Sequence, residues 1–292
     1  MLPRWPLAIA PILWNNDDLP ELAPPVPFER VLDEIAEAGY EGTELPTNAP
    51  RDAGLLRDQL RRRGLRLAGA FLALDFFTSP LDGELAQAGL LARLLREAGA
   101  TALVAGLAAH PQRMASAGGS RQPATTGAQY QQIATGLERV GERCRQENVV
   151  LAFHNHAGTF IETPEELEEL CQRADPALVR LCLDVGHLVV GGGDPVQAIQ
   201  RYGQRLAHLH IKDVDPHVLE RLRSGQGGFV NGLRWRIFCE LGHGCLDLAG
   251  VVGALRQQRF EGWVVLEQDT SFRTPLESAV ESRTRFREVA GY

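Results

Sequence analysis

Short runs of apolar residues alternate along the chain with longer stretches whose apolar residues recur at helical spacing. The short runs have the length of buried β-strands, and the longer stretches have the period of amphipathic helices. We predict strands at Leu7–Leu13, Gly42–Leu45, Leu65–Leu72, Ala102–Ala105, Val149–His154, Val179–Asp184, Leu206–Ile211 and Trp263–Glu267. We predict helices at Pro27–Ala38, Ala53–Arg63, Glu84–Ala98, Gln129–Glu147, Pro164–Arg173, Pro195–Tyr202 and Leu248–Gln258.

This alternation defines the fold class. Strands that alternate with helices form parallel sheets joined by right-handed crossovers. Eight such units within 292 residues match an α/β fold of the (β/α)8 TIM-barrel type. The alternative is a doubly wound sheet, which would need a glycine-rich phosphate turn after the first strand, and APILWNND has none. No linker divides the chain, so we predict a single domain over residues 1–292, with a long surface loop at 118–127.

Polar residues gather where four consecutive predicted strands end. These ends read FHNH, LCLDVGH, HLHIKD and VVLEQD, and they contain five of the eight histidines of the chain. In a TIM barrel such ends share the active-site mouth. Each residue alone could cap a helix or pair within a loop, but four apolar strands that all end in His, Asp or Glu need partners. A divalent ion held by one Asp, one Glu and one or two His would supply them, and this donor set suits Mn²⁺, Co²⁺, Zn²⁺ or Fe²⁺.

In the seventh strand, residue spacing separates the candidate metal ligand from the residues around it. A spacing of two places His208, His210 and Lys212 on one face, with the last of them nearest the mouth. We therefore predict His210 as a ligand and His208, lower in the barrel, as a core histidine. Lys212 can donate to a substrate oxygen or stabilise a developing oxyanion. After the sixth strand, Gly186 permits a turn that would bring His187 back over the site.

The amino-acid composition gives a second reason to single out Lys212, and it argues against several classes of function. It is the only lysine among 30 basic residues. The net charge of -7 argues against a nucleic-acid binder. Five cysteines without a C-x-x-C pair argue against a disulfide framework and a zinc knuckle, and favour the cytoplasm. No apolar run reaches the roughly 18 residues of a membrane span, so no membrane partner is expected.

At these motifs the chain resembles the xylose-isomerase-like superfamily of metal-dependent sugar isomerases and epimerases, over nearly its whole length. Within that superfamily it is most similar to the inosose (2-keto-myo-inositol) dehydratases. The resemblance rests on APILWNNDDLPEL, GYEGTELP, HNHAGTFIET, LCLDVGHLVVGGGDP, HLHIKDV, ELGHGCLDL and GWVVLEQD. It implies one divalent ion per barrel, with Mn²⁺ or Co²⁺ favoured over Zn²⁺ or Fe²⁺.

The resemblance also implies the ligands of that ion. Asp184, His210 and Glu267 match the family's metal positions. The wider family has a glutamate at the end of the fifth strand, where this chain has His154. The fourth ligand is therefore open between His154 and Glu162 in the following loop. The change also removes one of the two glutamates that the family's epimerases use for proton transfer, which favours a dehydratase or an isomerase with other bases.

The chemistry that the resemblance implies is proton abstraction next to a carbonyl. The metal polarises the carbonyl, and a glutamate or histidine removes the proton, with Glu267 as the candidate glutamate. Loss of a hydroxyl group then needs a general acid, for which His187 and His156 are the candidates. Lys212 is expected to act as a substrate-contacting cation.

Three further residues are expected at the substrate. Glu44, at the end of the second strand, should point into the same mouth as a ligand of a substrate hydroxyl or as a second base. Trp14 and Asn15, after the first strand, are predicted to form a wall for the sugar ring, with plain packing as the alternative for Trp14.

The leading hypothesis is a cytoplasmic, metal-dependent inosose dehydratase acting on a small keto-polyol. A sugar or sugar-acid isomerase or epimerase is the second hypothesis. An abasic-site DNA endonuclease of related fold is disfavoured by the charge of -7, and a non-catalytic sugar-binding barrel is a further alternative. The sequence leaves open whether the chain forms a homo-oligomer.

Overall fold

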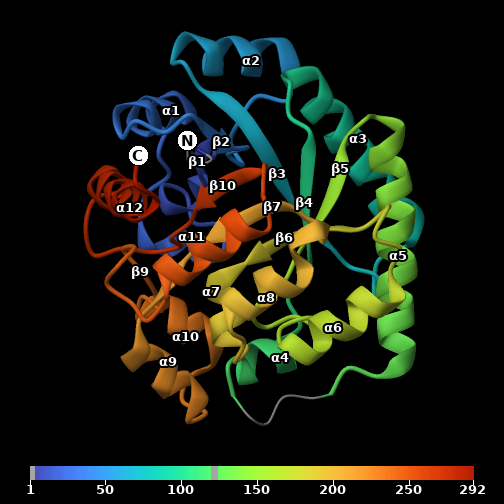
Figure 1. The fold of residues 1–292 in the computed structure, drawn as a ribbon. Helices are drawn as coiled ribbons and strands as arrows, with labels where there is room; N and C mark the ends of the chain where they lie inside the picture. Colours follow the sequence, from blue (N-terminus) through green and yellow to red (C-terminus); the bar gives the residue numbers. More distant parts are fainter. Residues whose placement is uncertain (1–3, 120–123) are drawn as a thin grey trace.

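A closed barrel of eight parallel strands forms the centre of the computed structural model, which describes residues 4–119 and 124–292. The strands follow the order β1-β10-β7-β6-β5-β4-β3-β2, and helices surround them (Figure 1). The predicted TIM barrel is thereby confirmed. The barrel strands are β1 (Leu7–Ile9), β2 (Gly42–Glu44), β3 (Arg66–Leu74), β4 (Ala102–Leu107), β5 (Val150–His154), β6 (Arg180–Asp184), β7 (Leu206–Ile211) and β10 (Trp263–Leu266).

Helices connect the barrel strands and cover their outer faces. They are α1 (Phe28–Glu37), α2 (Ala53–Arg62), α3 (Leu81–Ala98), α4 (Pro111–Ser116), α5 (Gly127–Gln146), α6 (Pro164–Arg173), α7 (Val185–Val190), α8 (Pro195–Tyr202), α9 (Pro216–Arg223), α10 (Gly228–Arg234), α11 (Leu248–Gln257) and α12 (Pro275–Ala290). Three short 3₁₀ turns, η1 (Pro11–Leu13), η2 (Pro20–Leu22) and η3 (Gly203–Arg205), complete the connections.

Local side chains set the helix boundaries. At the start of α6 the Thr163 hydroxyl accepts a bond from the Glu166 amide, and the Glu166 carboxylate accepts one from the Thr163 amide. Thr274 and Glu277 repeat this capping box at α12. Gly99 ends α3 with φ of 90°, a left-handed conformation that glycine adopts without strain.

Alternation along the strands separates two cores. The large cluster lies between the strands and the helices, and it takes Leu7 and Ile9 from β1. The alternate positions are small and belong to two minor clusters, Ala8, Ala10, Ala68 and Val265 in one and Val104, Ala152 and Cys182 in the other. Because successive strand residues face opposite sides, these small residues fill the barrel interior. The polar site lies above them.

The connection from β7 to β10 forms a small unit of its own. It contains β8 (Asp213–Val214), α9, α10 and β9 (Phe238–Cys239), with β8 and β9 paired antiparallel. Its apolar residues make a separate cluster that includes Val214, Phe229 and Phe238 and also takes in Ala157 from the β5–α6 loop. The unit is therefore packed against the loops at the barrel mouth.

The structure differs from the sequence predictions at several boundaries. The first predicted strand, Leu7–Leu13, ends at Ile9 and continues as η1, since Pro11 has no amide hydrogen for a strand ladder. The other seven predicted strands overlap barrel strands. Helices α4, α7, α9, α10 and α12 were not predicted as helices. Part of the predicted loop 118–127, residues 120–123, lies outside the described residues.

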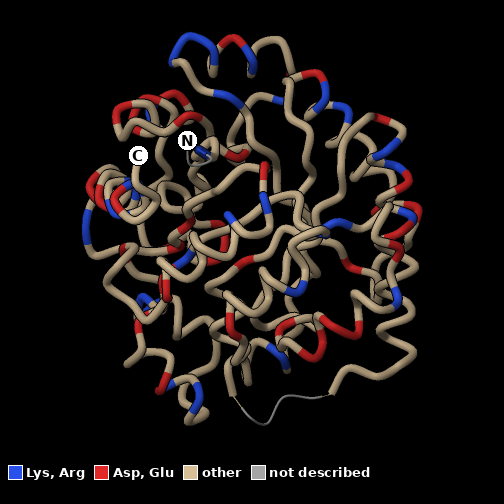
Figure 2. Tube along the Cα trace, in the orientation of Figure 1, with Lys and Arg blue, Asp and Glu red and all other residues tan. Residues whose placement is uncertain are grey.

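Charged residues of both signs are interspersed along the outer helices (Figure 2). In this view they form no continuous basic face of the kind that nucleic acids require. Among the described residues, none of the helices has the length and apolar character needed to cross a membrane.

Candidate metal and substrate site

Four side chains converge above the barrel interior. They come from neighbouring strands in the order β5-β6-β7-β10, and one ligand atom of each of His154, Asp184, His210 and Glu267 lies within 4.8 Å of the others. Asp184 Oδ2 lies 3.3 Å from His154 Nε2 and 3.7 Å from His210 Nδ1. His210 Nδ1 is 2.5 Å from Glu267 Oε2. The arrangement offers two nitrogens and two carboxylates to one point.

The donor atoms of this group fit a cation. Asp184 Oδ2, His210 Nδ1 and Glu267 Oε2 are buried and make no well-formed hydrogen bond within residues 4–119 and 124–292. Buried polar atoms without partners are rare in native proteins and mark places where an ion or a water belongs. Two imidazoles and two carboxylates match the ligand chemistry of a divalent transition metal. The residues present therefore fit the metal that the resemblance implies.

Glu162, the alternative fourth ligand, is engaged elsewhere. Its Oε1 accepts a hydrogen bond of 2.7 Å from the Gly118 amide, and its Oε2 accepts one of 2.6 Å from the Gly158 amide. The structure brings His154 into the group and uses Glu162 to join two loops. Among the described residues, the group of four converging ligands contains His154 and not Glu162.

A second group of potential ligands lies lower in the barrel. Cys182, His208 and His210 have donor atoms within 4.8 Å of one another. Burial raises the pKa of the Cys182 thiol to about 11, so the thiolate that would bind a metal is disfavoured. The Nε2 atoms of both histidines are already hydrogen-bonded to Glu44. The upper group is the better metal site.

Asp184 is held in place from two sides. Its Oδ1 accepts a bond of 2.7 Å from the His187 amide, so it caps α7 while Oδ2 faces the other ligands. The Asn155 side chain makes two hydrogen bonds to the Asp184 backbone. Its oxygen accepts a bond of 3.0 Å from the Asp184 amide, and its nitrogen donates a bond of 3.1 Å to the Asp184 carbonyl. This clamp joins the ends of β5 and β6. The sequence pattern H-N-H contained Asn155, but gave it no role.

Lys212 is buried among carboxylates. Its Nζ lies 2.9 Å from Asp269 Oδ1 and 3.1 Å from Glu267 Oε1, and its side chain is 1% exposed. Burial alone would lower the pKa of Lys212, but Asp269, Glu267 and Asp184 raise it above its ordinary value. The ammonium also lies 4.6 Å from the centre of the Phe238 ring. Lys212 is therefore a buried positive charge next to the four converging residues.

The two candidate acids, His156 and His187, stack with ring centres 3.7 Å apart. Of the two, only His156 lines the cavity that opens beside the four ligands. His187 is fully buried behind it, and its Nε2 lies 3.0 Å from Lys212 Nζ. The Nδ1 of His156 lies 2.7 Å from the Ala157 carbonyl, to which it must donate, so its Nε2 carries the lone pair. Burial, with His154 and Lys212 nearby, lowers the pKa of His156 to about 3.

A cavity of about 250 Å³ opens beside the four ligands. Its lining includes apolar residues, among them Phe71 and Leu107, and polar ones, among them His156, Asp17 and Asp18. Burial raises the pKa of Asp18, and the Glu267 and Asp17 carboxylates add to this, while Lys212 opposes it. A cavity of mixed character suits a ring that has both carbon faces and hydroxyl groups.

The predicted wall residues separate in the structure. Asn15 lines the cavity, and its side chain bonds both the amide and the carbonyl of Val26. Trp14 is not among the lining residues; its indole is buried in the large core and donates to Glu34 Oε2 at 2.7 Å. The packing alternative therefore describes Trp14.

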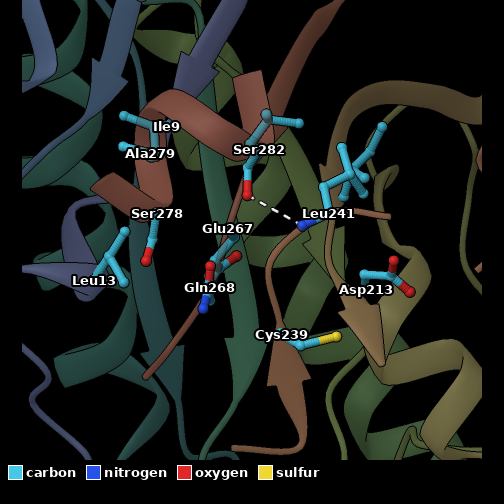
Figure 3. Close-up of a pocket in the computed structure, with 12 residues that line it drawn as sticks. Ile9, Leu13, Asp213, Cys239, Leu241, Glu267, Gln268, Ser278, Ala279 and Ser282 are labelled. Carbon is cyan, nitrogen blue, oxygen red and sulfur yellow. Dashed lines mark hydrogen bonds between the residues drawn. The ribbon is translucent and has the colours of Figure 1, made fainter. Parts of the chain in front are cut away.

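A smaller cavity of about 10 Å³ lies behind Glu267 (Figure 3). Ser278 and Ser282 of α12 border it, and the Ser282 hydroxyl accepts a bond of 3.1 Å from the Leu241 amide. This volume holds about one water molecule and excludes a sugar. The larger cavity is the one that can receive a substrate.

Comparison with known proteins gives the family. Residues 32–289 match the family described as "Xylose isomerase-like TIM barrel". The chain belongs to this family. Inosose dehydratase of Geobacillus thermodenitrificans is 34% identical over 290 residues, covering 98% of this chain and 97% of the relative. Inosose dehydratase of Clostridium beijerinckii is 31% identical over 294 residues, with coverages of 98% and 97%.

A solved structure agrees in fold. The IolI protein with a binding zinc atom superposes with a TM-score of 0.74 at 15% identity, and the match covers 98% of each chain. That similarity supports the barrel over its full length. The resemblance stated from the sequence motifs is confirmed.

Sequence reasoning missed several residues at this site. Asp17, Asp18 and Thr159 line the cavity, and Asp269 contacts Lys212. The acidic pair was visible in the motif WNNDD, and Asp269 in the strand end VVLEQD. Phe229 lies with its ring centre 5.5 Å from that of His156; it belongs to helix α10, far along the chain, and carries no sequence signal.

Proposed function

We propose that this protein is an inosose dehydratase, a metal-dependent hydro-lyase that removes water from 2-keto-myo-inositol. The observation that carries the proposal is the convergence of His154, Asp184, His210 and Glu267 beside a cavity of ring size. The inosose dehydratases at 31% and 34% identity support the substrate. We further propose Mn²⁺ or Co²⁺ as the ion and the cytoplasm as the compartment; the latter agrees with five free cysteines.

The four converging residues would hold the ion, and a divalent ion there supplies the Lewis acidity that favours proton loss next to a carbonyl. Glu267 has one further contact that matters, because its Oε1 lies 3.1 Å from the Lys212 ammonium. Lys212 therefore fixes Glu267 in its ionised form and keeps positive charge near the place where an oxyanion develops.

His156 is the proposed proton carrier, since it lines the cavity and presents the lone pair of Nε2. It accepts the proton from the carbon next to the carbonyl, and the electron pair of that C–H bond forms the carbon–carbon double bond. The C–O bond of the neighbouring hydroxyl breaks, and His156 returns its proton to the leaving oxygen. One water molecule is released, and His156 ends in its starting form.

His187 supports this role without reaching the substrate. It stacks on His156, and its Nδ1 accepts a hydrogen bond of 3.2 Å from the Ala157 amide. Phe229 lies against both rings, at 5.5 Å from His156 and 5.6 Å from His187. These contacts keep bulk water away from the histidine pair and fix the orientation of His156.

The direct test is turnover. Protein loaded with Mn²⁺ or Co²⁺ is incubated with 2-keto-myo-inositol, and the ultraviolet absorbance of the dione and the loss of one water by mass spectrometry are followed. The expected result is product formation that stops when a chelator removes the metal. Absence of product with every metal would refute the proposal, and recovery of an epimer carrying solvent deuterium would favour an epimerase.

A further inference from the structure

Glu44 differs from the other polar residues at the mouth in the strand that carries it. It ends β2, which is three strands away from β7 around the closed barrel. Its side chain nevertheless crosses the interior and meets two imidazoles of β7. Glu44 Oε1 lies 3.0 Å from His208 Nε2 and 2.9 Å from His210 Nε2, and Glu44 is 4% exposed.

An irregularity in the strand pairing directs Glu44 into the barrel interior. The pairing of β2 with β3 shifts between Thr43 and Glu44, so that Glu44 lies opposite Gly69 after Thr43 has paired with Leu67. A Cβ on Gly69 would lie 3.0 Å from the Ala102 carbonyl oxygen and 3.6 Å from the His208 ring. The irregularity and the glycine together leave space inside the barrel for the carboxylate and the His208 ring.

The bonds to Glu44 fix the hydrogen on each ring. A carboxylate only accepts hydrogen bonds, so both His208 and His210 must carry hydrogen on Nε2. With Nε2 protonated, a neutral His210 has its lone pair on Nδ1. That atom faces Asp184 and Glu267.

We propose that Glu44 is a positioning residue for the metal: it selects the Nε2–H form of His210 and holds the ring with Nδ1 toward the other ligands. This changes the role expected from the sequence, which was contact with a substrate hydroxyl or a second base. A carboxylate behind a metal-bound histidine typically changes metal affinity about 10–100-fold when removed. His208 shares the same oxygen and keeps it inside the barrel.

The inference rests on the metal site of the proposed function and not on its substrate. A protein that fails to dehydrate 2-keto-myo-inositol would still bind zinc with the dependence on Glu44 described below. The two failures are therefore distinguishable.

The test is zinc affinity of the metal-free protein, measured by competition with a chromophoric chelator. Glu44→Asp keeps the charge but draws the carboxylate back by one methylene group, and we expect roughly 10–100-fold weaker binding. Glu44→Gln keeps an acceptor oxygen at the same reach, so its loss should be smaller than that of Glu44→Asp. Glu84→Gln is the matched control, because it neutralises a buried carboxylate on α3, outside the cavity, and should bind zinc as the wild type does.

Nitrogen-15 spectra of the histidine rings give a second readout. The zinc form of the wild type should show His210 protonated on Nε2, and Glu44→Asp should show loss of that hydrogen bond. Glu44→Leu removes the acceptor entirely, and if it fails to fold, the Asp and Gln variants still decide the matter. Wild-type zinc affinity in Glu44→Asp, together with a raised KM alone, would overturn the proposal and restore Glu44 as a substrate contact.

Discussion

Two groups of barrel strands end in opposite chemistry although their backbones are alike: β5, β6, β7 and β10, which we call the polar half, and β3 and β4, which we call the apolar half. In β5, β6 and β7, together with the residue after β10, the mouth receives His154, Asp184, His210 and Glu267. In β3 and β4 the strands end in Leu74 and Leu107, and apolar side chains of these strands line the cavity. Parallel strands deliver every end to the same mouth. The identity of the terminal residues therefore decides which half offers metal-ligand atoms and which half lines the cavity with apolar side chains.

The difference also has an energetic side. Buried charges are tolerated only when paired and hydrogen-bonded. In the polar half Lys212 pairs with Glu267, the His187 amide bonds Asp184, and His210 bonds Glu44. The donor atoms left without a hydrogen bond are the ones that fit a cation. The apolar half needs no such network and contributes through burial. Substitutions in the polar half should therefore affect metal binding and turnover most, and substitutions in the apolar half should affect stability.

The largest effect is expected from Asp184→Asn. This change keeps the side-chain oxygen that caps α7 but removes the charge directed at His154 and His210. Zinc affinity should fall by more than the roughly 100-fold typical of losing an outer partner, and turnover should fall with it. Metal content by elemental analysis and zinc competition measure this. Retention of both metal and activity would place the ion elsewhere.

The next effect is expected from Lys212→Arg. A guanidinium is planar and larger than an ammonium, and the buried Lys212 ammonium already lies against Asp269, Glu267 and the Phe238 ring. We expect kcat/KM to fall about 100-fold, in the range for loss of a charge-stabilising donor, while the fold survives. Steady-state kinetics and circular dichroism test both parts. Wild-type turnover would show that the single lysine is accidental.

The apolar half predicts the reverse outcome. Leu74→Ala, at the end of β3, should lower the free energy of unfolding by about 2–5 kcal/mol because it leaves a cavity in the buried core. Its zinc affinity should equal that of the wild type. Urea unfolding and zinc competition on the same preparation make the comparison. A loss of metal affinity as large as that of Asp184→Asn would mean that the two halves are not separable.

The smallest effect concerns an ion pair on the outer surface. Arg201 and Tyr202 lower the pKa of Glu168 to about 2. Since the folded pKa lies below that of the unfolded chain, Glu168 contributes stability above about pH 4.5 that is lost as the pH falls toward 2. For an exposed pair this amounts to less than about 1 kcal/mol.

Urea unfolding of Glu168→Gln at pH 3 to 7 checks the sign. The difference from wild type should be largest near neutral pH and shrink on acidification. Glu169→Gln is the control, because Glu169 forms an ion pair with Arg173, one helical turn away, and lies on the same helix as Glu168. A difference that grows at low pH would contradict the assignment.

Much of the site was predictable because it depends on strand period and strand ends. The alternation in HLHIKD placed His208, His210 and Lys212 on one face, and the structure has them in that order. The location of His154 beside Asp184 also follows from the pairing of neighbouring strands. These features are local, so periodicity carries them.

Features that depend on contacts across the barrel were not predictable. The hydrogen bond between His210 and Glu44 joins strands that are not neighbours. It depends on a register shift between β2 and β3 that the sequence does not predict. Trp14 turns into the core because its indole finds Glu34 on α1. Glu162 is held by amides of two loops, and only their folded positions reveal this.

The central claim is that one divalent ion is bound by the polar half of the barrel at His154, Asp184, His210 and Glu267. Anomalous X-ray scattering at the zinc edge, from crystals of the zinc-loaded protein, tests it most directly. We predict one strong anomalous peak among the four side chains, in contact with His210 Nδ1. A peak at Cys182 and His208 instead, or no peak at full zinc loading in solution, would contradict it.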